Sequence, residues 1–391
     1  MESHALDQTQ PSSEGSAAPT HSVGQPCATT ERPLFVDLDG TLIATDLLHE
    51  GFLRAIRQQP LVLLLMPHWL RQGLAMFKQQ IAELAPVNAE TLPYRNHFVA
   101  HLMAERARGR PIILATASPE QWARPVAEYL GCFDDIIASD TTHNRKSTAK
   151  LAAIRKWCEQ RGHRDFDYCG DSSADRVLWA TSKVAVLVGR GTRFRSELTM
   201  RGIACTEFAT TIASPATIWR AERPWRWVKN FIVFVPLWLT ASTASHWLTA
   251  TITYFAFCAV ASAGYVINDA FDLDSDRRHP TKQHRPLATG LMNLPQGLKL
   301  AVCLLSLAGM LAACAGSTSI AATLAGYVVV STLYSAWLKT VPIVNLVCLA
   351  SLSTSRLLAG SLASPTPLAG WVLLAALLSA IALHVAWPRG D

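Results

Sequence analysis

The chain has 391 residues, of which 50% are hydrophobic and only 16% are charged. Soluble globular proteins average about 25% charged residues, so the composition excludes a chain that is soluble along its whole length. The net charge is +6. Whether this excess indicates nucleic-acid binding or membrane topology depends on where the basic residues lie in the chain. The nine cysteines contain no CxxC pair and are odd in number, which excludes a zinc ribbon and disfavours a disulfide framework.

The first segment, residues 1 to about 32, is rich in Ser, Thr, Pro and Gln and has no apolar periodicity. Such a segment cannot bury enough apolar surface to offset its chain entropy, so we expect a disordered tail. It lacks the basic start and the apolar core of a signal peptide. Together with the cysteine usage, this favours a cytoplasmic location for the domain that follows.

Residues 33–222 alternate short apolar runs with amphipathic stretches. The expected strands are Leu34–Leu38, Pro111–Ala115, Asp135–Ala138, Asp167–Cys169 and Val184–Val188. This rhythm predicts an α/β Rossmann-like domain, in which helices flank a parallel sheet. The long interval between the first two strands is mostly helical in pattern.

Two carboxylates, Asp37 and Asp39, directly follow the first expected strand. At the carboxyl end of a parallel strand both can face a crevice. Such a pair supports phosphoryl transfer, in which one carboxylate attacks phosphorus, the other moves a proton and Mg²⁺ neutralises the clustered charge. Further along the chain, Thr116 places a hydroxyl at the end of a second strand, and Lys150 places a cation at the start of a helix. Asp171 and Asp175 follow another strand and are acidic metal ligands.

The order DxDGT, strand-end Thr, Lys and GDxxxD resembles the haloacid-dehalogenase superfamily of phosphatases over about residues 33–205. By that likeness Asp37 is the nucleophile and Asp39 is the general acid and base. Both would also belong to the Mg²⁺ site, which Asp171 completes with Asp175 nearby. The resemblance therefore implies a Mg²⁺-dependent phosphatase domain.

The same resemblance implies that Thr116 and Lys150 hold the phosphate. Lys146 is an alternative to Lys150, because both precede the same expected helix. The helical interval at about residues 45–100 resembles the superfamily's cap, which closes over the substrate. Pro60–Met66 is an apolar stretch within this cap; we favour cap core for it, and contact with the bilayer or the membrane domain is the alternative.

The composition of the chain changes after Arg223, where long stretches without charged residues begin. Four runs contain no Asp, Glu, Lys or Arg: residues 230–268, 300–338, 340–355 and 357–388. Because a spanning helix needs about 20 apolar residues, we expect about six spans. They lie at roughly 231–247, 248–268, 296–315, 318–338, 342–361 and 367–387. Residues 223–391 are thus predicted to form an all-α polytopic membrane domain.

Basic residues cluster at the ends of these spans. Arg223, Arg226 and Lys229 precede the first, Arg277, Arg278, Lys282 and Arg285 follow the second, and Lys339 follows the fourth. An even number of expected spans separates the clusters, so all lie on one side, which the positive-inside rule makes cytoplasmic. We expect a multi-pass protein of the cell inner (plasma) membrane with a cytoplasmic N-terminal domain and no nucleic-acid partner.

Three carboxylates, Asp269, Asp272 and Asp276, end the second expected span. Their spacing of three and four residues places them on one helical face. Like charges at this position need a counter-ion, and carboxylate oxygens select hard cations such as Mg²⁺, which can in turn bind a diphosphate. Carboxylates at a membrane boundary are functional candidates by default.

The pattern NDxxDxxxD, followed by KQHRPLATG, resembles the UbiA superfamily of intramembrane prenyltransferases. By that likeness Asn268 joins the three carboxylates in binding Mg²⁺–diphosphate, and Lys282 and Arg285 neutralise phosphate. Tyr334 and Lys339 match a later polar element of the family. Members of the family have more spans than are expected here, so the membrane domain is predicted to be incomplete.

The fusion of the two parts resembles bacterial relatives of decaprenyl-phosphate phosphoribosyltransferase. The resemblance implies a polyprenyl phosphate or prenyl diphosphate lipid, with phosphoribosyl diphosphate as a second substrate. It predicts a UbiA-family transferase, moving a prenyl or phosphoribosyl group, joined to a phosphomonoesterase of the same lipid pathway. The alternative is a membrane-anchored phosphatase whose helical half only binds lipid phosphate.

Overall fold

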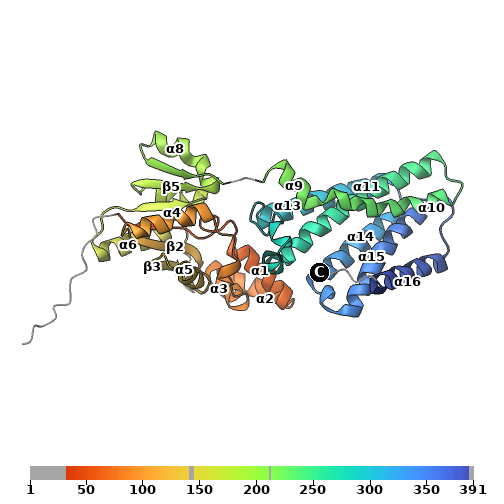
Figure 1. Ribbon diagram of the computed structural model, residues 1–391, viewed down its shortest axis with the longest axis horizontal. Coiled ribbons are helices and arrows are strands. Elements are labelled where there is room, and N and C mark those ends of the chain that lie inside the picture. The colour runs from red at the N-terminus through yellow and green to blue at the C-terminus, as the bar shows by residue number, and fades with distance from the viewer. Residues whose placement is uncertain (1–31, 141–144, 211–212, 387–391) are drawn as a thin grey trace, which may run out of the picture. The chain divides into compact units, whose positions relative to one another are not determined.

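The structure is a computed structural model, and it describes residues 32–140, 145–210 and 213–386. The expected tail, residues 1–32, lies outside these residues apart from Arg32. Residues from Glu31 onward form one contact unit, in which an α/β domain is followed by a helical domain (Figure 1). Both parts agree with the predicted fold class.

The α/β domain is built on a six-stranded sheet in the order β3-β2-β1-β4-β5-β6, in which every pairing is parallel. The strands are β1 (Leu34–Val36), β2 (Ile112–Pro119), β3 (Asp135–Ser139), β4 (Asp167–Gly170), β5 (Val184–Val188) and β6 (Ala204–Phe208). The first five coincide with the expected strands to within a few residues. β6 is not among the expected strands, because its side chains are exposed or half-buried at the sheet edge and form no apolar run.

Helices cover both faces of the sheet. On one face lie α4 (Asn96–Ala107) and α5 (Glu120–Leu130), and on the other lie α6 (Thr148–Arg161), α7 (Arg176–Trp179) and α8 (Arg195–Met200). Successive side chains of β1 point to opposite faces, so Val36 packs with Trp122 of α5 whereas Phe35 meets Trp157 of α6 edge-on, 5.4 Å between ring centroids. Since β1 lies between β2 and β4, a crevice opens at the carboxyl ends of these central strands.

The segment between β1 and α4 corresponds to the expected cap. It consists of α1 (Leu47–Gln58), α2 (Val62–Arg71), α3 (Leu74–Leu84) and the 3₁₀ turn η1 (Ala89–Thr91). Asp46 caps α1 by accepting hydrogen bonds from the backbone N–H groups of Leu48 and His49, at 2.9 and 3.2 Å.

The prediction that Pro60–Met66 forms cap core is wrong for most of the stretch. Val62 and Met66 are buried, but Leu61 and Leu64 are 72% and 76% exposed. The helical period explains the difference, since residues four apart on α2 share the inner face and the leucines between them point outward.

The helical domain begins after α9 (Pro215–Glu222). Its elements are the 3₁₀ helix η4 (Pro224–Phe234), α10 (Val235–Trp238), α11 (Ala244–Phe271), α12 (Leu273–Arg278), η5 (Lys282–His284), α13 (Leu294–Cys314), α14 (Thr318–Ala336), η6 (Leu338–Thr340), α15 (Pro342–Leu362) and α16 (Gly370–Ala386). Within the described residues, four helices are long and apolar enough to cross a membrane: α11, α13, α14 and α15. They coincide with the second to fifth expected spans.

The first and last expected spans differ from single long helices. The last is α16, which has 17 residues. The first, expected at 231–247, is misplaced: η4 and α10, of 11 and 4 residues, cover 224–238 with Pro236 at the start of α10, and residues 244–247 already belong to α11. A 3₁₀ helix rises about 2.0 Å per residue and an α-helix about 1.5 Å, so the two pieces cover about 28 Å, close to the roughly 30 Å of a bilayer core. η4 and α10 together are too short to cross the bilayer core as a continuous α-helix, but the larger rise of the 3₁₀ helix brings their combined length close to the thickness of that core.

Close packing of η4 against α15 depends on Gly360. A Cβ built at this position lies 2.0 Å from the Val233 carbonyl oxygen, and backbone cannot move away as a side chain can. We expect Gly360→Ala to destabilise the full chain by about 1–3 kcal/mol, because η4 and α15 must separate. Thermal unfolding in detergent, followed by circular dichroism, measures the change. Gly309→Ala on α13 is the matched control, since its Cβ meets nothing within 4 Å; equal melting temperatures for the two variants would contradict the packing argument.

Candidate functional site

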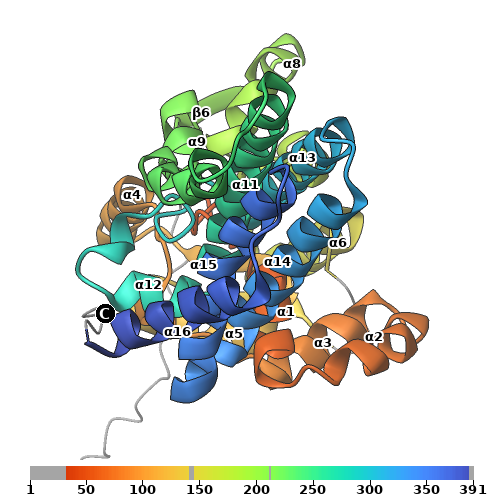
Figure 2. The ribbon, with the colours of Figure 1, turned by 90° about the vertical axis from the view of Figure 1, so that its right-hand side faces the viewer.

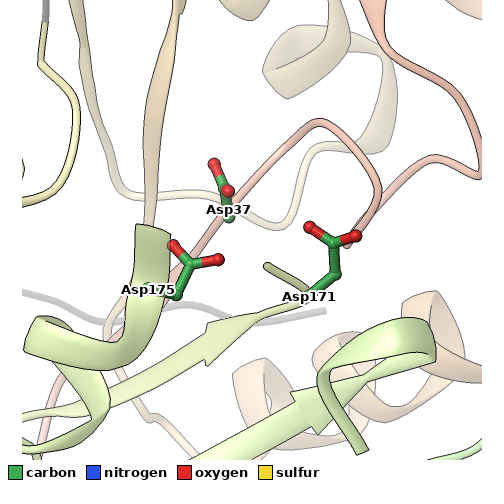
Figure 3. A group of neighbouring side chains, drawn as sticks. All are labelled: Asp37, Asp171 and Asp175. Carbon is green, nitrogen blue, oxygen red and sulfur yellow. The ribbon is translucent and has the colours of Figure 1, made fainter. Parts of the chain in front are cut away.

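The first candidate site lies at the carboxyl ends of β1 and β4. Figure 3 shows Asp37 facing Asp171 and Asp175 across this edge of the sheet. One oxygen of each of the three carboxylates lies within 4.8 Å of the others, and all three side chains are buried. Gly40 makes this approach possible, because its φ is +77° and a Cβ there would lie 2.4 Å from Asp171 Oδ2.

Hydrogen bonds hold the nucleophile candidate in place. Asp37 Oδ1 accepts from the Leu38 backbone N–H and from the Lys150 ammonium, each at 2.9 Å. Lys150 also donates to the Tyr168 hydroxyl at 3.0 Å, and that hydroxyl donates to Asp175 at 2.8 Å. One buried cation therefore fixes two of the three carboxylates.

The electrostatics of the three carboxylates fit a divalent cation. Burial raises the pKa of Asp37 even though Lys150 opposes the shift. Burial also raises the pKa of Asp171 to about 7, with the charges of Asp37 and Asp175 adding to it. Removing water from three like charges is costly, and a hard cation with oxygen ligands offsets that cost. Mg²⁺ would be held here by Asp37, Asp171 and Asp175.

Asp39 lies outside this group of three among the described residues. Its carboxylate accepts a hydrogen bond from the Leu47 backbone N–H at 2.8 Å and another from the Ser118 hydroxyl. Burial raises the pKa of Asp39 to about 7, with nearby Asp46 contributing. A carboxyl group that keeps its proton up to about neutral pH is suited to general acid catalysis.

The structure separates the phosphate-binding candidates. Lys146 and Lys150 both line the surrounding pocket, and Lys150 also contacts Asp37. Thr116 is fully buried, and its hydroxyl accepts from the Ser118 N–H at 3.0 Å. Ser118, two residues later on the same strand, is the hydroxyl that lines the pocket. The two-residue period of a strand is the signal that would have included it.

The pocket in front of these residues has a volume of about 570 Å³. Its lining includes the basic side chains Lys78, Arg95, Lys146 and Arg190. The segment between η5 and α13 also contributes, through Gly290, Leu291 and Asn293. Sequence reasoning missed all of these except Lys146, because nothing in their local pattern marks them as pocket residues.

The second candidate site lies at the end of α11. Asp269 accepts hydrogen bonds from Arg223 at 2.6 and 2.5 Å and from Arg285 at 3.1 Å. Arg285 also donates to Asp276 at 2.6 Å. In the described part of the chain, these carboxylates and Asp272 do not gather into a metal-binding group, and each is paired with a basic side chain.

The neighbouring polar residues complete the second site. Asp272 pairs with Lys339 at 2.5 Å and accepts a hydrogen bond from the Asn268 amide at 2.9 Å. Lys282 lies in η5 and forms no ion pair with the described carboxylates, and Tyr334 is half-buried on α14.

Arg223 is a site residue that sequence reasoning assigned to membrane topology alone. Its side chain is 7% exposed, and its backbone adopts a left-handed φ of 53°, which side-chain-bearing residues rarely do. Its position immediately before Pro224 marks a turn but gives no sign of the partner. Only the fold brings it to Asp269.

Comparisons with known proteins agree with the two domains. Residues 34–178 match the haloacid dehalogenase-like hydrolase model, and residues 230–388 match the UbiA prenyltransferase family. The chain is 33% identical over 365 residues to the uncharacterized protein y4nM of Sinorhizobium fredii. The aligned region covers 92% of this chain and 69% of that protein.

Two further similarities concern the helical domain's family. The chain is 33% identical over 162 residues to the decaprenyl-phosphate phosphoribosyltransferase of Corynebacterium glutamicum, 40% of this chain and 49% of that enzyme. A solved UbiA homolog from Archaeoglobus fulgidus, bound to GPP and Mg²⁺, is 20% identical with a TM-score of 0.40, and the match covers 43% of this chain and 61% of that one. The chain thus spans less than two thirds of the length of either protein. From these matches and the two motif sets, the chain belongs to the family of y4nM and joins a haloacid dehalogenase-like hydrolase domain to a membrane-integral UbiA prenyltransferase-family domain.

Proposed function

We propose that the chain is a bifunctional enzyme of lipid-phosphate metabolism in the inner (plasma) membrane. Its UbiA-family half transfers a phosphoribosyl group from phosphoribosyl diphosphate to a polyprenyl phosphate, and its cytoplasmic half is a Mg²⁺-dependent phosphomonoesterase that removes the 5-phosphate of the product. The observation that carries the proposal is the buried group of Asp37, Asp171 and Asp175 beside Lys150.

In the phosphatase half, a carboxylate oxygen of Asp37 attacks phosphorus and the ester P–O bond breaks. Asp39 gives its proton to the leaving alcohol oxygen, which its raised pKa allows. Asp39 then accepts a proton from the water that hydrolyses the aspartyl phosphate, and inorganic phosphate leaves. Lys150 and the Ser118 hydroxyl orient the reacting groups. Bound Mg²⁺ would offset the negative charge of the phosphate.

In the membrane half, Arg223, Arg285 and Lys339 supply positive charge beside the carboxylates. A diphosphate has the charge to engage these cations. Asn268, Asp269, Asp272 and Asp276 supply the oxygen ligands that would hold the accompanying Mg²⁺. The similarity to decaprenyl-phosphate phosphoribosyltransferase supports phosphoribosyl diphosphate as the donor, in place of a prenyl diphosphate.

One observation favours a second function. The ligand oxygens of Asp37, Asp171 and Asp175 lie within 4.8 Å of one another, whereas the carboxylates of the membrane half form no such group among the described residues. A membrane-anchored phosphatase with a non-catalytic, lipid-phosphate-binding helical half fits this difference.

An assay of the full chain in lipid nanodiscs separates the two functions. The chain receives decaprenyl phosphate, Mg²⁺ and phosphoribosyl diphosphate with a labelled ribose. We expect labelled lipid without a 5-phosphate from the unaltered chain, and labelled lipid that retains the 5-phosphate from Asp37→Asn. Release of phosphate from small phosphomonoesters with no labelling of the lipid would favour the anchored phosphatase.

The proposed orientation predicts the sides of two loops. A reporter fused after Arg278 should be cytoplasmic, and one fused near Ser317 should be external, because α13 separates them and the Lys and Arg residues gather at the Arg278 end. Paired phosphatase and fluorescent-protein fusions read the two sides independently. A cytoplasmic signal at both positions would show that α13 does not cross the membrane.

A further inference from the structure

The cap carries an exposed apolar surface that the proposed function does not use. We define the leucine surface as the exposed leucines on α2 and its flanks: Leu61, Leu63, Leu64, Leu65, Leu70 and Leu74, which are 46–76% exposed. The inner face of α2 is closed by Val62, Met66 and Trp69, all buried. The leucine surface is therefore the remaining circumference of a helix that has already packed its core side.

Among the described residues of the α/β domain that precede α9, clustered exposure of this kind occurs on α2 and its flanks. Other strongly exposed apolar side chains of the described α/β domain, such as Met103, Tyr129 and Met200, stand singly. Single exposed apolar residues are normal, but six leucines within residues 61–74 form a contiguous patch of the kind that marks an interaction site. Figure 2 shows α2 and α3 as adjacent helices, with α2 on the outside of the pair.

The charge around the leucine surface has one sign. No Asp or Glu occurs between Glu50 and Glu83, and of the arginines in this stretch Arg71 lies on α2, whereas Arg54 and Arg57 lie on α1 and pair with Asp274 and Asp272. Arg71 and His68 are exposed on α2 itself. Apolar residues combined with basic ones and no acids fit the surface of an anionic bilayer.

The contacts of α1 tie the cap to the ends of the membrane helices. Arg54 donates two hydrogen bonds to Asp274 of α12, each at 2.7 Å. Arg277 donates to Glu50 at 2.9 and 2.6 Å, and both side chains are nearly fully buried. The Trp337 indole N–H, just past α14, donates to the Ile56 carbonyl at 3.4 Å. Because α11 and α14 are candidate spans, these contacts hold the cap near a membrane boundary.

We propose that the leucine surface rests on the bilayer in which α11, α13, α14 and α15 are embedded, with Arg71 and His68 beside anionic lipid head groups. In this position the leucines lie about 5–10 Å into the boundary between head groups and acyl chains. A second copy of the chain is disfavoured as the occupant, because two such basic surfaces would face each other without acids between them.

Photo-crosslinking in the full chain tests the proposal. p-Benzoylphenylalanine replaces Leu64 in one variant and Leu61 in another, in nanodiscs of phosphatidylcholine and phosphatidylglycerol. We expect lipid adducts by mass spectrometry at both positions, comparable with those from the same probe at Phe231 in η4. Tyr129 and Met200, exposed elsewhere on the α/β domain, are the matched controls and should give almost none.

Two outcomes would overturn the proposal. Covalent dimers without lipid adducts at Leu61 and Leu64 would assign the surface to a second copy of the chain. An absence of adducts there, with adducts present at Phe231, would show that the surface faces water. Circular dichroism of each variant shows that the probe leaves the fold intact, and two probe positions keep the test decisive where one variant fails to fold.

Discussion

Asp37→Asn is expected to abolish phosphate release from small phosphomonoesters by the full chain with Mg²⁺. The substitution keeps the shape of the side chain but removes the nucleophilic carboxylate that Lys150 contacts at 2.9 Å. It also replaces one of the three grouped carboxylates, Asp37, Asp171 and Asp175, by a neutral amide. Losing a nucleophile that acts as part of a unit costs roughly 10⁴–10⁶-fold in turnover. Colorimetric detection of phosphate from p-nitrophenyl phosphate measures the loss.

A surface carboxylate provides the matched control for this variant. Asp165 is half-exposed and pairs only loosely with Lys183, at 3.7 Å. Asp165→Asn makes the same chemical change away from the crevice and should leave turnover unchanged. Full turnover by pure, folded Asp37→Asn protein would remove Asp37 as the nucleophile, and with it the proposed phosphatase mechanism.

The second large effect is expected at the membrane site. Asp269→Ala and Asp272→Ala should each lose Mg²⁺-dependent binding of diphosphate, because each removes a carboxylate from a set of few metal ligands. Equilibrium dialysis of labelled diphosphate against the full chain in detergent, with Mg²⁺ or with EDTA, measures the binding. Asp269→Ala should also destabilise the fold, by about 3–5 kcal/mol, since it leaves the buried Arg223 without its partner.

The matched control is Asp274→Ala, five residues further along. Asp274 pairs with Arg54 and has no contact with the Arg223 and Arg285 cations. The control should retain Mg²⁺-dependent diphosphate binding. Unchanged binding in folded Asp272→Ala, or equal loss in Asp274→Ala, would contradict the assignment of the site to the motif carboxylates.

The parts of the phosphatase site that adjoin strands could be predicted from the sequence. Asp37 and Asp171 directly follow apolar runs, and parallel strands bring such positions to one edge. Thr116 was the nearest hydroxyl by pattern, yet it is fully buried, and Ser118 reaches the pocket. The two-residue strand period adds Ser118 as a second candidate, but the local sequence does not show that β2 continues to Pro119 and brings Ser118 to the crevice.

Other features depend on contacts between distant segments. Arg223 meets Asp269 across 46 positions of sequence, and no periodicity links them. The leucines of α2 were assigned to core because hydrophobicity alone does not distinguish a buried side chain from one that faces another medium. The first expected span, 231–247, is wrong in both bounds and geometry, since η4 and α10 cover 224–238 and an apolar run fits a 3₁₀ helix as well as an α-helix.

The 3₁₀ geometry of η4 sets the distance that the chain covers between Arg223 and α10. Converting its 11 residues to α-helix would shorten the segment by about 5.5 Å, close to the pitch of one α-helical turn. A displacement of that size is about twice the 2.6 Å distance between the Arg223 guanidinium and the Asp269 carboxylate, so it would break their hydrogen bond. The hydrogen-bond register of one short segment thus sets whether the Arg223 guanidinium reaches Asp269, and the packing of Val233 on Gly360 holds that segment in place.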